Sequence, residues 1–200
     1  MLRWYFLILA LTFVAQAAAT EEEIVVNGGF ETGQLQPWTT DEFIMSSGAG
    51  GHSGNYDVYM ASWGDPPSID GYIRQDLGRT YYAYEVKSAS FWIYPDFLAR
   101  YGGRYPCQTD FRIYLGDNNE YDVPPLPDTG WGWIIQWYKI NVPLSEIQYP
   151  FDYVYIWVHV HMTTGTPPYN LYAALDDVSV TISHTGVTPA SWGRVKATFR

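Results

Sequence analysis

The chain has 200 residues, and its 11 basic and 21 acidic side chains give a formal net charge of −10 at pH 7. Because an acidic domain repels phosphate backbones, nucleic acid is excluded as a favoured partner. The composition is also aromatic, with 18 Tyr, 9 Trp and 9 Phe. Tyr and Trp each bring a polar atom that needs a hydrogen-bond partner. This composition therefore favours aromatic surfaces that meet a partly polar ligand, and sugars are ligands of that kind.

Residues 1–19 have the pattern of a secretory signal. Arg3 supplies a positive start, Leu7–Val14 is an apolar run, and Ala17-Ala18-Ala19 provides small residues for cleavage. The run is shorter than the roughly 20 apolar residues that a membrane span needs. We therefore expect cleavage after Ala17 or Ala19, no membrane span, and a protein that is secreted or held at the cell surface.

The rest of the chain fits one domain, because domains usually contain about 100–200 residues. It holds a single cysteine, Cys107, which excludes an internal disulfide. Two alternatives stay open for this residue, a free thiol in a loop and a disulfide with another chain.

From residue 24 to residue 183, short runs rich in Val, Ile, Tyr, Phe and Trp alternate with clusters of Gly, Pro, Asn and Asp. This pattern predicts an all-β domain, a two-sheet antiparallel β-sandwich. The expected strands, in chain order, are Ile24–Val26, Trp38–Met45, Tyr56–Ala61, Gly71–Asp76, Lys87–Tyr94, Asp110–Leu115, Ile134–Val142, Tyr153–His161 and Ala173–Ile182.

The strand expected at Tyr153–His161 carries the sharpest pattern in the chain. With a period of two, Val154, Ile156, Val158 and Val160 form an aliphatic row that suits a core. The opposite row is aromatic throughout and polar at every member: Tyr153, Tyr155, Trp157, His159 and His161. Two interpretations stay open for that row, a ligand-binding surface and a second packed layer covered by a loop or by the end of the chain.

Two other expected strands offer similar outward residues. Trp92 and Tyr94 alternate with core positions in one, and Arg112 and Tyr114 do so in the other. Aromatic rings stack on the apolar faces of sugar rings, and polar side chains bind the hydroxyls. We expect one concave sheet to carry a set of ligand-binding residues: Trp92, Tyr94, Arg112, Tyr114, Tyr155, Trp157 and His159.

His159 and His161 are two residues apart, so in a strand they lie on one face and could hold a transition metal. Such sites usually include further ligands, and the residues directly after His161 supply none. Metal binding at this pair is therefore the weaker interpretation.

The end of the chain, residues 184–200, differs from the domain before it. Trp192, Val195 and Phe199 share one face of a short helix, and three basic side chains accompany them. A linker with a short basic helix is expected there, either packed on the domain or serving as a sorting or anchoring tail.

Three segments resemble the galactose-binding-like jelly rolls, in particular carbohydrate-binding modules of the CenC-like type. They are Val26-Asn27-Gly28-Gly29-Phe30-Glu31-Thr32-Gly33 followed by Trp38, Gly51-His52-Ser53-Gly54-Asn55-Tyr56, and Leu175-Asp176-Asp177-Val178. The resemblance implies a jelly-roll sandwich. It also implies a structural Ca²⁺ that ties the first turn to the last strand, with Glu31 and Asp177 as side-chain ligands. Asp176 and Asp177 are adjacent in an expected strand, so their side chains should point to opposite faces and only one of them should join a given site. Without a metal, Glu31 would cap a turn by accepting backbone N–H bonds.

Catalytic motifs are scarce in this sequence. A glycosidase needs two carboxylates about 5–10 Å apart, and the aromatic strands carry few acids on their outward rows. No G-x-S-x-G motif occurs. The sequence therefore predicts a secreted, non-catalytic domain that binds a polysaccharide or oligosaccharide. The alternatives are an adhesive cell-surface protein that uses the same aromatic residues on a protein partner, and a small jelly-roll glycoside hydrolase or lyase.

Overall fold

The computed structural model describes residues 20–47, 51–62, 68–98, 107–124, 136–162 and 170–184. The expected signal 1–19, the end of the chain from residue 185 and the segments around Trp63 and Trp131 lie outside these ranges. One unit of the chain spans Glu23–Ile182, and a second comprises Met1–Glu22 with Ser183–Arg200. No helix of the described residues has the length and apolar character to cross a membrane.

The described residues form antiparallel strands joined by turns, with two short 3₁₀ turns, η1 (Ala83–Glu85) and η2 (Leu144–Glu146). The strands are β1 (Thr20–Glu23), β2 (Thr39–Thr40), β3 (Ile44–Ser47), β4 (Tyr56–Ser62), β5 (Ser68–Tyr81), β6 (Val86–Leu98), β7 (Cys107–Leu115), β8 (Glu120–Asp122), β9 (Tyr138–Asn141), β10 (Phe151–Met162) and β11 (Asn170–His184).

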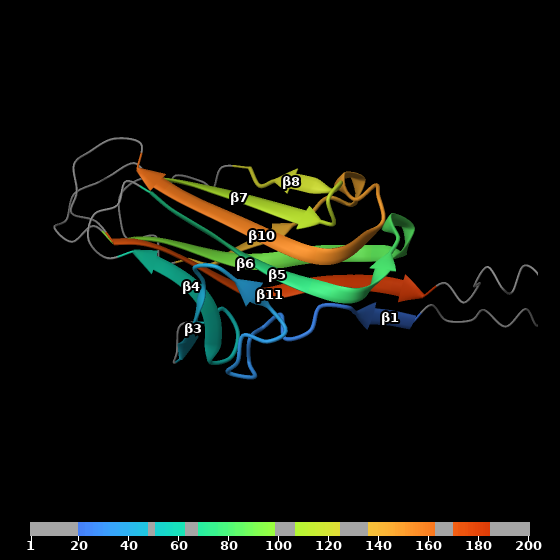
Figure 1. Cartoon of the computed structure of the whole chain (residues 1–200), viewed down its shortest axis with the longest axis horizontal. Coiled ribbons are helices and arrows are strands. Elements are labelled where there is room, and N and C mark those ends of the chain that lie inside the picture. The colour runs from blue at the N-terminus through green and yellow to red at the C-terminus, as the bar shows by residue number, and fades with distance from the viewer. Residues whose placement is uncertain are drawn as a thin grey trace, which may run out of the picture. The chain divides into compact units, whose positions relative to one another are not determined.

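Two sheets make up the fold. The first has the order β3-β4-β11-β6-β9, with β1 paired to β11, and the second has the order β2-β5-β10-β7-β8. The paths are antiparallel throughout. Figure 1 shows β7, β8 and β10 on one side of the view, with β3, β4 and β11 on the other. The predicted two-sheet antiparallel jelly-roll β-sandwich is confirmed.

The core lies between the sheets because each long strand alternates apolar residues with polar or aromatic ones. Ile73 and Ile156 of the second sheet, and Phe91 and Leu175 of the first, are fully buried in the same cluster. The aliphatic row predicted for β10 is likewise at most 1% exposed at all four positions. The inward row of β10 is thus confirmed, and its aromatic row faces away from the core.

Several expected strand boundaries are wrong. The run expected at Trp38–Met45 is split into β2 and β3, which belong to different sheets. A turn separates them, in which the Phe43 amide donates to the Thr40 hydroxyl at 2.8 Å and the Phe43 ring is buried. The alternation of apolar and polar residues continues through the turn, because Phe43 is buried in the core as a strand residue would be. The sequence pattern therefore does not reveal the break between β2 and β3.

The first expected strand and the placement of Cys107 also differ. Ile24 and Val25 are buried but follow β1, and the Ile24 amide donates to the carbonyl of Val180 at 3.0 Å. Cys107 was expected in a loop, whereas it begins β7 opposite Met162 of β10. Its neighbours are turn-forming residues, so sequence alone placed the start of this strand too late.

Candidate functional site

The outward side of the second sheet carries a continuous group of aromatic and cationic residues. It is centred on β10, which pairs with β5 on one side and β7 on the other. Trp157 lies opposite Tyr72 and Arg112, and Tyr155 lies opposite Arg74 and Tyr114. We call this group the aromatic face, and it comprises Tyr72, Arg74, Arg112, Tyr114, Tyr153, Tyr155 and Trp157.

Neighbouring rings on the aromatic face contact one another across the strands. The Tyr155 ring stacks on Tyr72, with centroids 5.0 Å apart and planes 25° apart, and meets the edge of Tyr114 at 5.3 Å. The Arg112 guanidinium lies 5.3 Å from the centroid of the Trp157 ring. Each of these side chains is half-buried. The rings therefore hold each other in place while part of their surface stays open to solvent.

Charged groups border the aromatic face from β8 and β5. Arg112 Nε lies 2.7 Å from a carboxylate oxygen of Asp122, and the Tyr114 hydroxyl donates to Glu120 at 3.1 Å. At the other side, Arg74 pairs with Asp76 at 2.9 Å and lies 3.9 Å from the centroid of the Tyr153 ring. Both cations thus have an acidic partner at the border of the face, which suits hydrogen bonding to an uncharged ligand.

The phenols of Tyr153 and Tyr155 remain protonated at neutral pH. Burial, together with a hydrogen bond to Asp117, raises the pKa of Tyr153 to about 12. Burial followed by the nearby charge of Asp41 also raises the pKa of Tyr155. Both hydroxyls therefore act as neutral hydrogen-bonding groups rather than as bases.

Trp92 and Tyr94 lie on a different sheet from the other predicted ligand-binding residues, which corrects the prediction of one shared surface. They belong to β6, which pairs with β11 and β9 in the first sheet. Alternation along a strand tells which residues share a face of that strand, but not which sheet the strand joins. Five of the seven predicted residues lie together on the second sheet: Arg112, Tyr114, Tyr155, Trp157 and His159.

A loop residue covers the Trp92 ring. His52 stacks on it with ring centroids 3.5 Å apart, and the same imidazole contacts Asp177 through Nδ1 at 2.7 Å. Tyr94 packs near Trp137, with centroids 5.4 Å apart. The Trp92 ring therefore packs against the loop that contains His52.

Asp176 and Asp177 meet the same residue, although they are adjacent in β11. A register irregularity interrupts the β11–β6 pairing between Asp176 and Ser179, and Asp177 has a φ of 47°. The Ser53 amide donates to Asp176 at 3.1 Å, and the Ser53 hydroxyl donates to Asp177 at 2.7 Å. The expectation that only one of these acids could join a given site is therefore wrong, because the bulge turns both toward one loop.

The first turn also contacts the bulge directly. The Val178 amide donates to the carbonyl of Gly28 at 3.0 Å, and a Cβ on Gly28 would lie 1.8 Å from the carbonyl oxygen of Val178. Phe30 and Trp38 are buried beside each other with ring centroids 5.9 Å apart. This motif thus forms a tight turn held against β11 and contributes a pair of aromatic rings to the core.

Glu31 holds the loop 51–56 to the first turn. Its carboxylate accepts backbone N–H bonds from Asn55 and Tyr56, each with a contact at 2.9 Å. Gly54, with a φ of 66°, approaches so closely that a Cβ there would overlap the Glu31 carboxylate. This is the capping arrangement that the sequence offered as the alternative to metal binding by Glu31.

Three oxygen atoms converge beside Gly51. The position of a Cβ on this glycine would lie 2.8 Å from the carbonyl oxygens of Ser53 and Tyr56, and 3.3 Å from a carboxylate oxygen of Asp176. Asp176 is completely buried, and this burial raises its pKa to about 7. Two carbonyls and a buried carboxylate around one point are a donor set that fits a hard cation such as Ca²⁺.

Sequence reasoning missed the contribution of β5 to the aromatic face. Tyr72 and Arg74 alternate with the core residue Ile73, so the signal of an outward row was present. It also missed that Asp110 of β7 lies opposite His159 of β10, which depends on a strand register that no sequence pattern specified.

Comparisons with known proteins agree with this fold. A scan against protein-family models found no match, and a search of curated proteins found no relative. Among solved structures, CBM27-1 of Caldicellulosiruptor saccharolyticus in complex with mannohexaose matches with a TM-score of 0.50 and 9% identity, over 82% of this chain and 96% of that one. The K1 cleaved adhesin domain of Lys-gingipain from Porphyromonas gingivalis W83 matches with a TM-score of 0.42 and 17% identity, over 82% and 96%. At these identities the first likeness establishes a shared jelly-roll fold, which is the fold that the resemblance implied.

Proposed function

We propose that this chain is an exported, non-catalytic domain that binds a polysaccharide or oligosaccharide on the aromatic face. The observation that carries the proposal is the half-exposed row of contacting rings over β5, β10 and β7, directly opposite an aliphatic core row. Folding needs the aliphatic row but does not require its partner to be aromatic. The sugar bound by the solved module with this fold is consistent with such a role.

In this proposal the rings stack on the sugar, and the polar groups that border them orient it through hydrogen bonds. Trp157 and Tyr155 present π faces to the apolar faces of sugar rings, which bury area without a charged contact. Arg112 donates hydrogen bonds to sugar hydroxyls, and the Tyr114 oxygen, whose own proton goes to Glu120, accepts them. Asp122 and Glu120 already position these two side chains. Because the polar groups are ordered before binding, less conformational entropy is lost on association.

The decisive experiment replaces Trp157 with Ala and measures glycan binding and thermal melting together. A lost stacking surface should weaken binding by roughly 1–3 kcal/mol, that is about 5- to 150-fold, with a near-normal melting temperature. A matched control is Tyr84→Ala, because Tyr84 is 76% exposed in η1 outside the aromatic face. Loss of glycan binding in Tyr84→Ala with none in Trp157→Ala would contradict the proposal.

The two alternatives predict different outcomes in the same assays. An adhesive protein would show no binding across a panel of polysaccharides while Trp157→Ala abolished capture of its protein partner. A hydrolase or lyase would release new sugar ends from a polysaccharide on prolonged incubation. A glycan that quenches tryptophan fluorescence without being cleaved supports the binding domain.

We further propose a structural Ca²⁺ beside Gly51, held by Asp176 and the carbonyls of Ser53 and Tyr56. This replaces the predicted Asp177, whose carboxylate already contacts His52 and Ser53. Glu31 lies in the adjoining turn and fixes the amides of Asn55 and Tyr56. Bound Ca²⁺ would neutralise the buried carboxylate and connect the loop 51–56 to β11, so its contribution is to stability.

A further inference from the structure

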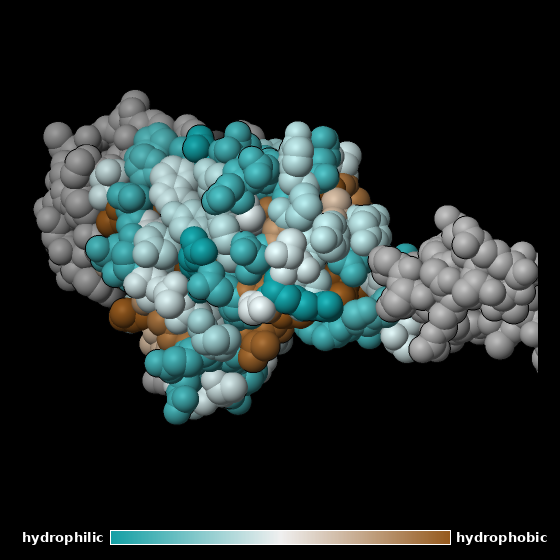
Figure 2. All heavy atoms as spheres, turned by 45° about the vertical axis from the view of Figure 1, so that its right-hand side comes forward, coloured by the Kyte–Doolittle hydropathy of each residue, from teal (hydrophilic) through white to brown (hydrophobic). Residues whose placement is uncertain are grey.

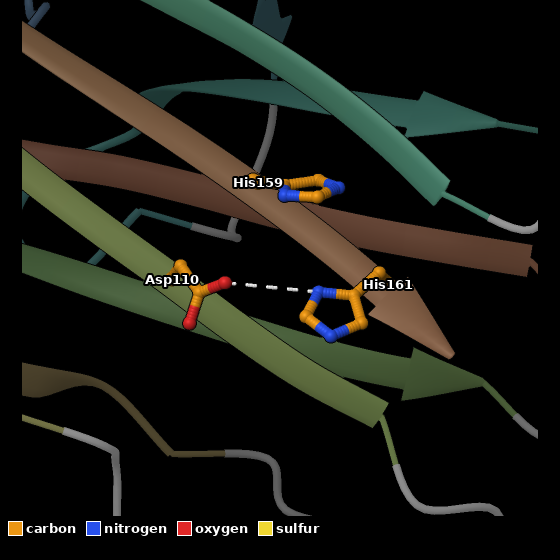
Figure 3. A group of neighbouring side chains, drawn as sticks. All are labelled: Asp110, His159 and His161. Atoms are coloured by element: carbon orange, nitrogen blue, oxygen red, sulfur yellow. Dashed lines mark ion pairs between the residues drawn. The ribbon is translucent and has the colours of Figure 1, made fainter. Parts of the chain in front are cut away.

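His159, His161 and Asp110 form a cluster at one end of the second sheet, beyond the aromatic face. Figure 3 shows the two imidazoles on β10 and the carboxylate on the neighbouring strand β7, all on one side of the ribbon. One ligand atom of each residue lies within 4.8 Å of those of the other two. We infer that this cluster is a binding site for a divalent transition-metal ion such as Zn²⁺.

The arrangement follows from the sheet geometry. Residues two apart in a strand share a face, which puts His159 and His161 side by side with ring centroids 5.0 Å apart. The antiparallel register then sets Asp110 directly opposite His159. The third ligand that the sequence lacked after His161 is thus supplied by another strand, more than forty residues away in sequence but adjacent in the sheet.

The spacing suits a metal better than a hydrogen bond. His161 Nδ1 lies 3.7 Å from a carboxylate oxygen of Asp110, which is beyond hydrogen-bond distance. Ligand atoms at about 2.1 Å from a tetrahedral Zn²⁺ lie about 3.4 Å from each other. His161 Nδ1 is also shielded from solvent and has no hydrogen-bond partner among the described residues. A metal ion would satisfy this buried nitrogen.

The charges next to the cluster favour a cation. The two residues opposite His159 in the sheet are both acidic, Asp70 on β5 and Asp110 on β7. Those opposite His161 are Ser68 and Gln108, so neither cross-strand neighbour brings a positive charge. Two imidazoles with a carboxylate suit Zn²⁺, Ni²⁺ or Cu²⁺ rather than Ca²⁺, which prefers oxygen ligands. This cluster and the oxygen donors near Gly51 therefore select different ions.

The test is direct titration of the whole untagged chain with Zn²⁺, after removal of bound metal, by isothermal calorimetry and by competition with a chromogenic chelator. We expect one equivalent to bind. His159→Gln and His161→Gln should each weaken binding at least tenfold, and Asp110→Asn should weaken it by a smaller factor. The control is His184→Gln, since His184 contacts Glu22 and is not a member of the cluster, so its loss should leave the affinity unchanged.

Substitution with Co²⁺ gives a readout of the ligands themselves. Imidazole-bound Co²⁺ should show visible absorption bands that are lost in the double variant His159→Gln with His161→Gln. Equal Zn²⁺ affinity in the parent chain and in this double variant, with both melting normally, would overturn the inference. So would the absence of any stoichiometric binding, in which case His161 and Asp110 form an ion pair only when the imidazole is protonated.

Discussion

Asp176 and its neighbour Asp177 differ in environment although they are adjacent in sequence. The Asp176 carboxylate is buried and accepts hydrogen bonds from the amides of Ser53 and Asp177, whereas Asp177 contacts His52 at a partly exposed position. Burial without a cationic partner favours the neutral acid, which is why the pKa of Asp176 rises. The bulge therefore places Asp176 and Asp177 in different environments, although their positions in the sequence do not distinguish them.

The raised pKa of Asp176 gives the metal-free protein a defined pH dependence. A carboxyl with a pKa of about 7 in the folded protein and 3.8 in the unfolded chain binds more protons when folded. The free energy of unfolding therefore falls as the pH rises between these two values. We expect denaturant unfolding with chelator to show this fall, and Asp176→Asn to show a smaller one. An identical slope in both proteins would contradict the assignment.

Bound Ca²⁺ should stabilise the ionised form of Asp176, whereas burial in the metal-free protein disfavours that form. Because a cation competes with the proton, saturating Ca²⁺ should raise the melting temperature most at neutral pH. Asp176→Asn should abolish this rise, and Asp177→Asn should retain part of it. A chelator that leaves the melting temperature of the parent protein unchanged would argue against the site. If the Ca²⁺-dependent rise were lost in Asp177→Asn and kept in Asp176→Asn, Asp177 would be the ligand, as the resemblance implied.

Along β10, residues that stabilise the core alternate with residues that face a ligand. Ile156 is fully buried and Trp157 is half-buried on the opposite side. Ile156→Ala should cost about 2–5 kcal/mol of unfolding free energy, because it removes core contacts and leaves a cavity. Trp157→Ala should cost clearly less. Chemical denaturation of both variants checks this, and a larger loss in Trp157→Ala would make the aromatic face a second core.

The contact between the first turn and β11 offers a further test. In Gly28→Ala the added methyl would meet the carbonyl of Val178, so the turn or the bulge must shift, which typically costs 1–3 kcal/mol. Gly78→Asn is a suitable control. It has a φ of 74° that Asn tolerates, and no atom lies near the added Cβ. Equal melting temperatures for the two variants would show that the turn is not held closely to the strand.

The elements were predictable from sequence to the extent that one face of each strand is buried. The alternation in β10 gave both rows, and Phe30 with Trp38 marked the first turn. Sheet membership was not predictable, because Trp92 and Trp157 have the same local pattern and differ only in their strand partners. The Asp177 bulge and the pairing of Asp110 with His159 depend on register, which is decided by contacts distant in sequence.

For the whole molecule, charge sets the class of glycan that we expect. The chain carries a formal net charge of −10, and the two arginines of the aromatic face are paired with acids. Polyanionic polysaccharides should therefore bind poorly, and a neutral one should bind with little dependence on salt. Affinity electrophoresis at low and high ionic strength checks this. Tight binding to an acidic polysaccharide that weakens steeply with salt would contradict it.

Figure 2 shows a face of largely hydrophilic and weakly polar side chains, with apolar spheres in small separate groups. The strands at the edges of the two sheet paths are short, at four residues in β3 and β9, two in β2 and three in β8. The strands between them run from seven to fifteen residues. Long open edges are templates on which further chains add and polymerise. In the described part of this chain, the strands that end each sheet path offer only two to four residues on which another copy could add. Such brief terminal strands limit strand-by-strand addition of further copies in a protein rich in β-structure and aromatic rings.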